Sequence, residues 1–288
     1  MNKKALLQLI IAMAIFGSIG FFSRLTGLAA LELIYVRAAC ASVFLLFVWF
    51  ITGSHHQERW LKKELLLIAL CGVSNLCNWI FLFKAFEVIS ITVAISLYHI
   101  GPILMLVVGA MIYREKLTRG IMLAMLACFI GTIFIMGTDV FSAEVPNWQG
   151  IIYGLLAAVF YAVTMLFGAT FKQTSVYMTT LIQMVVAVVL LTPFIAFDAY
   201  NSLTQTQWFY ALLTGIVHTG IVYLLLYTSI RQLSPTIVSF SVFVDPAVAI
   251  LLDIIITGFM PSSYQIIGIG AIFVGLLYSL FPRYQLKI

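Results

Sequence analysis

Residues 91–113 read ITVAISLYHIGPILMLVVGAMIY, and residues 236–257 read TIVSFSVFVDPAVAILLDIIIT. The first stretch contains no Asp, Glu, Lys or Arg, and the second contains only two aspartates. A helix of about 20 apolar residues crosses the roughly 30 Å of hydrocarbon in a bilayer. Both stretches therefore predict membrane-spanning helices, each interrupted near its middle by a proline, Pro102 or Pro246.

The composition of the whole chain fits this interpretation. Of its 288 residues, 63% are hydrophobic and 9% are charged, whereas about 25% are charged in an ordinary soluble domain. A transmembrane β-barrel would show short segments of alternating polarity, but the apolar runs here are long and continuous. The sequence therefore predicts an all-α integral membrane protein.

Apolar runs separated by charged or turn residues predict ten transmembrane helices. These lie near residues 5–23, 32–51, 65–86, 91–113, 118–137, 149–171, 176–197, 207–230, 236–257 and 263–281. The longest connections, 52–64 and 138–148, are too short for a soluble domain. Activity is therefore expected within the membrane or at its surface.

The basic residues predict the orientation. If the N-terminus is cytoplasmic, the inside segments hold twelve of the fifteen Lys and Arg residues: Lys3, Lys4, Arg59, Lys62, Lys63, Arg114, Lys116, Arg119, Lys172, Arg231, Arg283 and Lys287. The positive-inside rule then favours an N-in, C-in protein with an even number of spans. Lys3 and Lys4 also resemble the start of a signal peptide, but without a convincing cleavage site we expect an uncleaved first span.

An offset of 144 residues, half the chain, aligns the sequence with itself. It superposes Ser90 on Ser234, Thr92 on Thr236, Pro102 on Pro246, Phe129 on Phe273 and Gly131 on Gly275. The same offset lays spans one to five over spans six to ten, which predicts a first repeat at 1–143 and a second at 144–288. Because five is odd, the second repeat would be inverted, as in many secondary transporters. The alternative is that apolar helices resemble one another by composition.

Several short motifs also resemble a known family. They are Tyr35-Val36-Arg37-Ala38-Ala39, the prolines Pro102 and Pro246, and Arg114-Glu115-Lys116-Leu117-Thr118 before a span that contains Gly131. In this order the chain is similar to the drug/metabolite transporter superfamily and to its EamA-like exporters. The resemblance implies ten helices, cytoplasmic termini, a central cavity, and export or exchange of metabolites such as amino acids, or of drugs. The superfamily's substrates are too varied for this one to be carried over.

Polar side chains within the spans indicate where a solute would bind, because such groups are costly at the centre of a bilayer and usually face a cavity or a partner. The predicted binding residues are Asn75, Asn78, Trp79, Tyr98, His99, Tyr161, His218, Tyr223 and Asp245. Trp79 and Tyr223 are equivalent under the 144-residue offset. For Asn75 and Asn78, hydrogen bonding between helices is the alternative.

Two proline sites predict helix breaks near mid-membrane. Proline removes a backbone donor and clashes with the carbonyl four residues earlier, so we expect hinges at Gly101-Pro102 and at Pro246. Packing kinks are the alternative. Beside the second break, Asp245 is predicted either to couple protons, with His99 and His218 as relay partners, or to bind a substrate amine.

Three charged residues, Arg37, Lys84 and Asp253, are placed nearer the outer surface. Long basic side chains there can extend to the headgroups, and Arg37 and Asp253 lie at a depth at which they could pair. A gating or structural role is predicted for the three.

The sequence favours a secondary active transporter in the cell (plasma or inner) membrane, a monomer or weak homodimer, whose partners are a small solute, the bilayer and protons as a coupling ion. A channel or lipid flippase is the alternative. An intramembrane enzyme would need a nucleophile motif or metal ligands, and neither is found. Scattered cations and widely spaced cysteines leave no expectation of nucleic acid, metal or cofactor.

Overall fold

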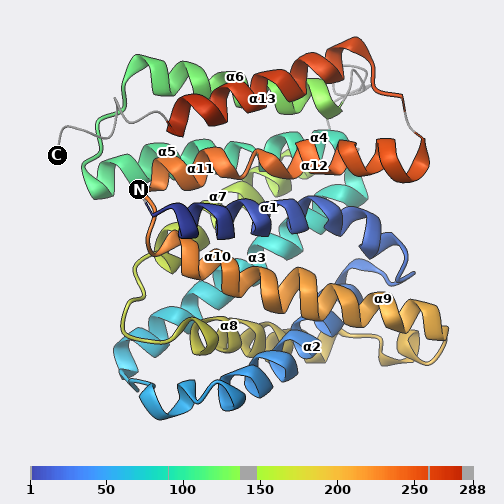
Figure 1. Cartoon of the computed structure of the whole chain (residues 1–288). Helices are drawn as coiled ribbons and strands as arrows, with labels where there is room; N and C mark the ends of the chain where they lie inside the picture. The colour runs from blue at the N-terminus through green and yellow to red at the C-terminus, as the bar shows by residue number, and fades with distance from the viewer. Residues whose placement is uncertain (1, 90, 137–147, 259, 281–288) are drawn as a thin grey trace. The chain divides into compact units, whose positions relative to one another are not determined.

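The structure is a computed structural model that describes all residues except 1, 90, 137–147, 259 and 281–288. Every regular element in the described ranges is helical (Figure 1). The α-helices are α1 (Lys3–Arg24), α2 (Ala30–Ile51), α3 (Lys62–Val88), α4 (Ile91–Tyr98), α5 (Ile100–Tyr113), α6 (Arg119–Met136), α7 (Trp148–Gly168), α8 (Val176–Leu191), α9 (Gln205–Gly215), α10 (Val222–Ile230), α11 (Pro235–Ser241), α12 (Val244–Leu252) and α13 (Ser263–Leu280). Short 3₁₀ helices are η1 (Ser54–Gln57), η3 (Thr192–Phe194) and η4 (Phe197–Tyr200), and π-helical turns are η5 (Ile216–Ile221) and η6 (Asp253–Thr257).

Within the described ranges, nine helices, counting adjoining segments as one, are long and apolar enough to cross a membrane. A tenth apolar helix, Arg119–Ile135, is shorter. Large apolar side chains point outward, among them Val43 and Phe47, which are 71% and 63% exposed. Such a surface suits contact with lipid chains, and helices satisfy their backbone hydrogen bonds internally, as the bilayer requires. The prediction of a multi-span α-helical membrane protein is therefore confirmed, while the number ten stays a prediction.

The sequence around each helix end explains several boundaries. Ser175 accepts a hydrogen bond from the Met178 backbone N–H at the start of α8, and Thr204 and Gln207 form a capping box at the start of α9. The α8 helix ends at Leu191, although the apolar run predicts a span to residue 197, because Pro193 follows and the chain tightens into η3.

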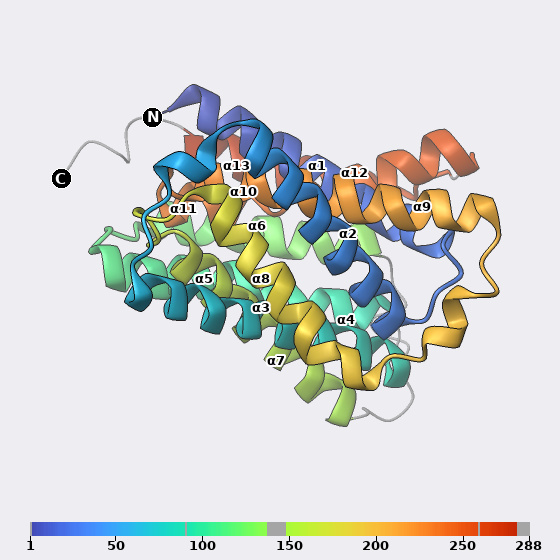
Figure 2. The ribbon, with the colours of Figure 1, turned by 90° about the horizontal axis from the view of Figure 1, so that it is seen from below.

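The chain forms two compact units, and each draws on both halves of the sequence. Unit 1 contains Met1–Ile80 and Val163–Gln232, and unit 2 contains Phe81–Ala162 and Leu233–Ile288. In unit 1, α2 packs against α8 and α9, and α1 packs against α10 (Figure 2). In unit 2, α6 packs along α13, and α5 packs against α11 (Figure 1).

Glycines allow close approach of helices in both units. In unit 1, a Cβ atom on Gly215 would lie 2.5 Å from Cys40 Cβ of α2. In unit 2, a Cβ atom on Gly131 of α6 would lie 2.7 Å from the backbone oxygen of Gly268 in α13. Small residues at such crossings let membrane helices pack backbone to backbone.

Two predicted spans of unit 2 consist of two helices each. The first changes from α4 to α5 at His99, and the second changes from α11 to α12 at residues 242–243. Pro102 and Pro246 are each the third residue of the second helix, so their missing N–H groups would have met the carbonyls of Tyr98 and Val242. Each break thus lies three to four residues before a proline.

Candidate functional site

A buried polar cluster of unit 1 surrounds Tyr223, and we call it the Tyr223 cluster. It consists of Phe16 of α1, Arg37 of α2, Asn75 and Trp79 of α3, His218 and Thr219 of η5, and Tyr223 of α10. The Tyr223 hydroxyl donates to Asn75 Oδ1 at 3.2 Å. The Tyr223 ring meets Phe16 and Trp79 edge to face, at centroid distances of 5.7 and 6.0 Å. The structure thus brings together Asn75, Trp79 and Tyr223, which the sequence analysis had grouped.

Arg37 belongs to the same cluster. Its side chain is 4% exposed, its Nε donates to Thr219 Oγ1 at 3.1 Å, and its Cζ lies 5.4 Å from the centroid of Trp79. The expectation that Arg37 extends to the outer headgroups is therefore wrong. The reason is local: Gly215 lets the chain entering η5 approach α2 closely, which leaves Thr219 within reach of the guanidinium.

The π-helical turn η5 supplies the remaining polar groups. Thr219 Oγ1 donates to the backbone oxygen of Thr214, five residues earlier, at 3.0 Å, a spacing that suits the wider turn. His218 is 2% exposed, with Nε2 2.9 Å from Ser18 Oγ and its ring 5.1 Å from Phe22. Single π-helical turns within α-helices occur frequently at functional sites, which makes η5 part of the candidate site.

The sequence analysis missed several residues that support this cluster. The Tyr227 hydroxyl donates to Gln183 Oε1 at 2.7 Å, and the Tyr227 ring lies 5.9 Å from Tyr223. Gln183 is 1% exposed and is an amide in the middle of the apolar run 176–197, so its polarity could have identified it. Thr219 and Ser18 gave no such signal, because hydroxyls in membrane helices commonly bond to their own backbone.

Unit 2 holds a second group of predicted residues around His99. Its ring lies 5.7 Å from Phe243 and 6.2 Å from Tyr98, and the Tyr98 ring lies 5.2 Å from Tyr161. His99 Nδ1 is 2.9 Å from the backbone oxygen of Ile95. A carbonyl only accepts, so Nδ1 carries the hydrogen and Nε2 presents a lone pair when the ring is neutral. Nε2 is buried and has no hydrogen-bond partner within the described ranges.

Asp245 lies in the first turn of α12 and is half-buried. Its Oδ1 is buried and finds no hydrogen-bond donor among the residues that the structure describes. The position at a helix N-terminus favours a negative charge there. Asp245 and His99 Nε2 thus both offer unpaired acceptors in unit 2.

The other predicted residues lie as follows. Asn78 is 1% exposed in α3. Lys84 is exposed, with its Nζ 5.9 Å from the Tyr153 centroid. Gly101 packs so closely on α7 that an added Cβ would lie 2.8 Å from the Tyr161 ring. Asp253 begins η6, but its side chain lies outside the described part, so its expected pairing with Arg37 stays a prediction.

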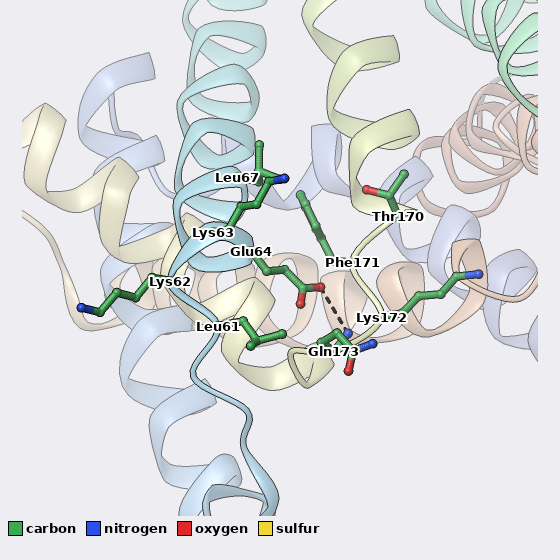
Figure 3. Close-up of a pocket in the computed structure, with 9 residues that line it drawn as sticks. All are labelled: Leu61, Lys62, Lys63, Glu64, Leu67, Thr170, Phe171, Lys172 and Gln173. Carbon is green, nitrogen blue, oxygen red and sulfur yellow. Dashed lines mark hydrogen bonds between the residues drawn. The ribbon is translucent and has the colours of Figure 1, made fainter.

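A surface pocket of about 610 Å³ lies in unit 1 where the connection into α3 meets the α7–α8 connection (Figure 3). It is lined by Leu61, Lys62, Lys63, Glu64, Leu67, Thr170, Phe171, Lys172 and Gln173. Glu64 Oε1 accepts a hydrogen bond from the Gln173 backbone N–H at 3.2 Å, while Lys62 and Lys172 extend to opposite sides (Figure 3). In the predicted orientation this pocket faces the cytoplasm.

An apolar layer lies between this pocket and the Tyr223 cluster. Ile68, Cys71 and Phe171 form a buried hydrophobic cluster, and on α3 its residues stand between Leu67 of the pocket and Asn75. From Leu67 to Asn75 a helix rises about 12 Å at 1.5 Å per residue. Along α3, buried apolar side chains therefore separate the pocket from the Tyr223 cluster.

The described residues contain no group of three or more His, Cys, Asp and Glu side chains arranged to hold a metal ion. All four cysteines are free, and Cys71 and Cys128 are buried. The Cys128 thiol donates to the backbone oxygen of Ile272 at 3.7 Å, so it joins α6 to α13. The chemistry that these sites offer is hydrogen bonding, charge and aromatic contact.

Comparison with known proteins shows similarity both in sequence and in fold. The model of the EamA-like transporter family matches residues 3–137 and 148–281. The protein named uncharacterized transporter YxxF, from Bacillus subtilis (strain 168), is 45% identical over 283 residues, which cover 98% of this chain and 91% of that protein. A crystal structure of a protein with 16% sequence identity matches 100% of both chains with a TM-score of 0.86. At that identity the structural likeness shows the fold alone.

Proposed function

The chain belongs to the EamA-like transporter family, and from that premise we propose that it is a secondary active carrier of a small metabolite. The solutes that we propose are amino acids or related small amphipathic compounds or drugs, moved by export or exchange. The family and the relative's name indicate a membrane transporter rather than an enzyme.

The observation that carries the proposal is the Tyr223 cluster. It places a buried cation, an amide, an imidazole, two hydroxyls and aromatic faces inside a unit built of apolar helices. Charged and polar groups at membrane depth are costly and are usually retained for function. A small amphipathic solute needs this combination of polar anchors and aromatic surface.

We also propose that the chain consists of two inverted repeats of five spans, 1–143 and 144–288. Residues separated by 144 positions touch in both units, which supports the repeat. In unit 1, Trp79 meets Tyr223. In unit 2, His99 meets Phe243 and Cys128 bonds to Ile272. Contact between equivalent residues is expected near a two-fold axis that relates two copies.

Contacts away from these pairs support the same symmetry. The backbone of Gly268 closely approaches Gly131, and that of Ala124 closely approaches Gly275. Adding 144 to Gly131 gives Gly275 and adding 144 to Ala124 gives Gly268, so the repeat offset exchanges the two contacts. In unit 1 an added Cβ on Gly72 would meet Gln183. With an offset of 143, this contact corresponds to that of Gly215 with Cys40.

The proposed mechanism is alternating access around a mid-membrane site, in the cell membrane, with both termini cytoplasmic. Asp245 is the proposed proton-coupling group, because it is a carboxylate beside a broken helix with an unpaired oxygen. His99 and His218 are proposed as relay partners, since an imidazole ring can accept a proton at one nitrogen and donate one from the other. The apolar layer at Phe171 is proposed to part when the cytoplasmic side opens.

The experiment is solute counterflow in proteoliposomes that contain the purified protein. A panel of labelled amino acids, amines and sugars is tested with and without a proton gradient. Saturable counterflow of one class supports a carrier, and its dependence on the gradient supports proton coupling. Solute flux without saturation or counterflow would favour a channel, and scrambling of labelled lipids would favour a flippase.

A further inference from the structure

Resting on the proposed transport function, we propose that Arg37 is the binding site for a carboxylate group of the transported solute. The starting point is an imbalance of charge in the Tyr223 cluster. Arg37 is 4% exposed, yet within the part of the chain that the structure describes no carboxylate forms an ion pair with it. Its one side-chain hydrogen bond there runs from Nε to Thr219.

The geometry leaves the end of the guanidinium available. A guanidinium has five N–H donors in a planar fork. In Arg37, Nε is used by Thr219, and Trp79 lies beside the guanidinium at 5.4 Å. The two terminal nitrogens form no hydrogen bond with the described residues. These two nitrogens form the edge that holds a carboxylate by two parallel hydrogen bonds.

The energetics favour a counter-charge for Arg37 that is present only while solute is bound. A buried charge with no counter-charge is strongly unfavourable, and natural proteins therefore usually pair it. Thr219 and Trp79 stabilise the guanidinium but do not neutralise it. A carboxylate on the solute would complete the site only while the solute is bound. The solute would then supply the ion-pair partner of Arg37.

The charge of the site also selects the kind of anion. Arg37 is the one Lys or Arg in the Tyr223 cluster, so it balances a single negative charge. A carboxylate supplies one charge, whereas a phosphate monoester carries nearly two at neutral pH. Trp79 lies beside the cation, and its contact with Tyr223, which in turn meets Phe16, extends the aromatic surface. This surface suits a carboxylate attached to an apolar or aromatic side chain.

The test compares matched solutes on matched variants. The solutes are phenylalanine, its amide and phenylethylamine, together with leucine and its amide. The variants are Arg37→Gln, which removes the charge, and Arg37→Lys, which keeps the charge but loses the fork. Arg24→Gln is the control, since Arg24 is an arginine of the same unit that is exposed at the end of α1. Counterflow and solute-induced thermal stabilisation of the purified protein are both measured.

We expect phenylalanine and leucine to inhibit counterflow of a labelled solute at concentrations at least about tenfold lower than their amides, which lack the carboxylate charge. Arg37→Gln should weaken acid binding about a hundredfold and leave amide binding nearly unchanged. The acid binding of Arg37→Lys should lie between that of Arg37→Gln and that of the unmodified protein. Arg24→Gln should match the unmodified protein. Retained thermal stability and amide binding show that Arg37→Gln is folded.

Equal competition by acids and amides, or full acid binding by folded Arg37→Gln, would overturn the assignment. If no solute shows counterflow but acids stabilise the unmodified protein and not Arg37→Gln, the carboxylate site stands and the transport proposal fails. If counterflow is found only for solutes without a carboxylate, transport stands and the assignment of Arg37 fails.

Discussion

The Tyr223 cluster of unit 1 and the residues around His99 in unit 2, here called the His99 region, differ in which hydrogen-bonding partners they lack. In unit 1, Arg37 has hydrogen-bond donors to spare and no carboxylate partner among the described residues. In unit 2, His99 Nε2 and Asp245 Oδ1 are buried acceptors without donors in the described ranges. The first therefore suits an anionic group, and the second suits a proton or a cationic group.

Under the proposed function, this difference separates recognition of the solute from coupling to protons. The Tyr223 cluster is held by hydrogen bonds and edge-to-face rings on five helical segments, so it is preorganised for recognition. The His99 region lies where α4 meets α5, and Asp245 lies where α11 meets α12. Broken helices leave backbone groups and side chains free to change partners. Recognition is thus expected of unit 1 and coupling of unit 2.

The largest effect is expected at Asp245. Asp245→Ala should abolish uptake driven by a proton gradient, because the titratable carboxylate is lost, while counterflow without a gradient continues. The measurement is solute uptake into proteoliposomes with an imposed pH gradient. Asp198→Asn, which changes an exposed carboxylate of η4, is the control. Unchanged gradient-driven uptake in Asp245→Ala would remove the coupling role from unit 2.

A second substitution tests recognition in unit 1. Trp79→Ala removes the ring beside Arg37 and the contact with Tyr223. The loss of these aromatic contacts should raise the half-saturation concentration about tenfold, with gradient dependence preserved. Trp148→Ala removes a 70% exposed ring and serves as the control. If Trp79→Ala loses both its affinity for the solute and the dependence of uptake on the proton gradient, recognition and coupling are not divided between the two units.

Helix packing in unit 2 gives a smaller effect, on stability. A Cβ atom on Gly131 would lie 2.7 Å from the Gly268 backbone oxygen, whereas one on Gly270 would have no atom within 4 Å. Gly131→Ala should lower the free energy of unfolding by about 1–3 kcal/mol. Gly270→Ala should raise it by roughly 0.5–1 kcal/mol, because alanine is the better helix former. Unfolding in detergent measures both, and equal values would contradict the close α6–α13 crossing.

The smallest effect is expected from a single hydroxyl. Tyr223→Phe removes the hydrogen bond to Asn75 Oδ1 and keeps the ring contacts with Phe16 and Trp79. The free energy of unfolding should fall by about 1 kcal/mol. Tyr264→Phe, at a 61% exposed ring of α13, should change it little. A loss above about 3 kcal/mol would mean that the cluster relies on this hydroxyl far more than on its rings.

Much of the fold followed from the sequence. The spans predicted at 5–23, 32–51 and 207–230 differ by at most two residues at each end from Lys3–Arg24, Ala30–Ile51 and Gln205–Ile230, because hydropathy is a sum over neighbouring residues. The resemblance to the EamA-like family is confirmed. The prediction for 176–197 was too long because an apolar run alone does not show where Pro193 ends the α-helix.

The candidate site was predictable only in part. The contact between Trp79 and Tyr223 agrees with their equivalence under the 144-residue offset. The burial of Arg37 against Thr219 was not predicted, because counting residues from a span boundary does not show which neighbouring helix a side chain packs against. Gln183 and Tyr227 were missed, although an amide in an apolar run is visible in the sequence.

The sequence by itself determined that this chain spans a membrane several times, which family it resembles, and where prolines interrupt its helices. These properties depend on residues next to one another along the chain. Only the tertiary structure decided that Arg37 lies against Trp79 and Thr219, and that Asp245 Oδ1 finds no hydrogen-bond donor among the described residues. These contacts join residues that are distant in the sequence, such as Arg37 and Thr219, so they depend on how the helices pack.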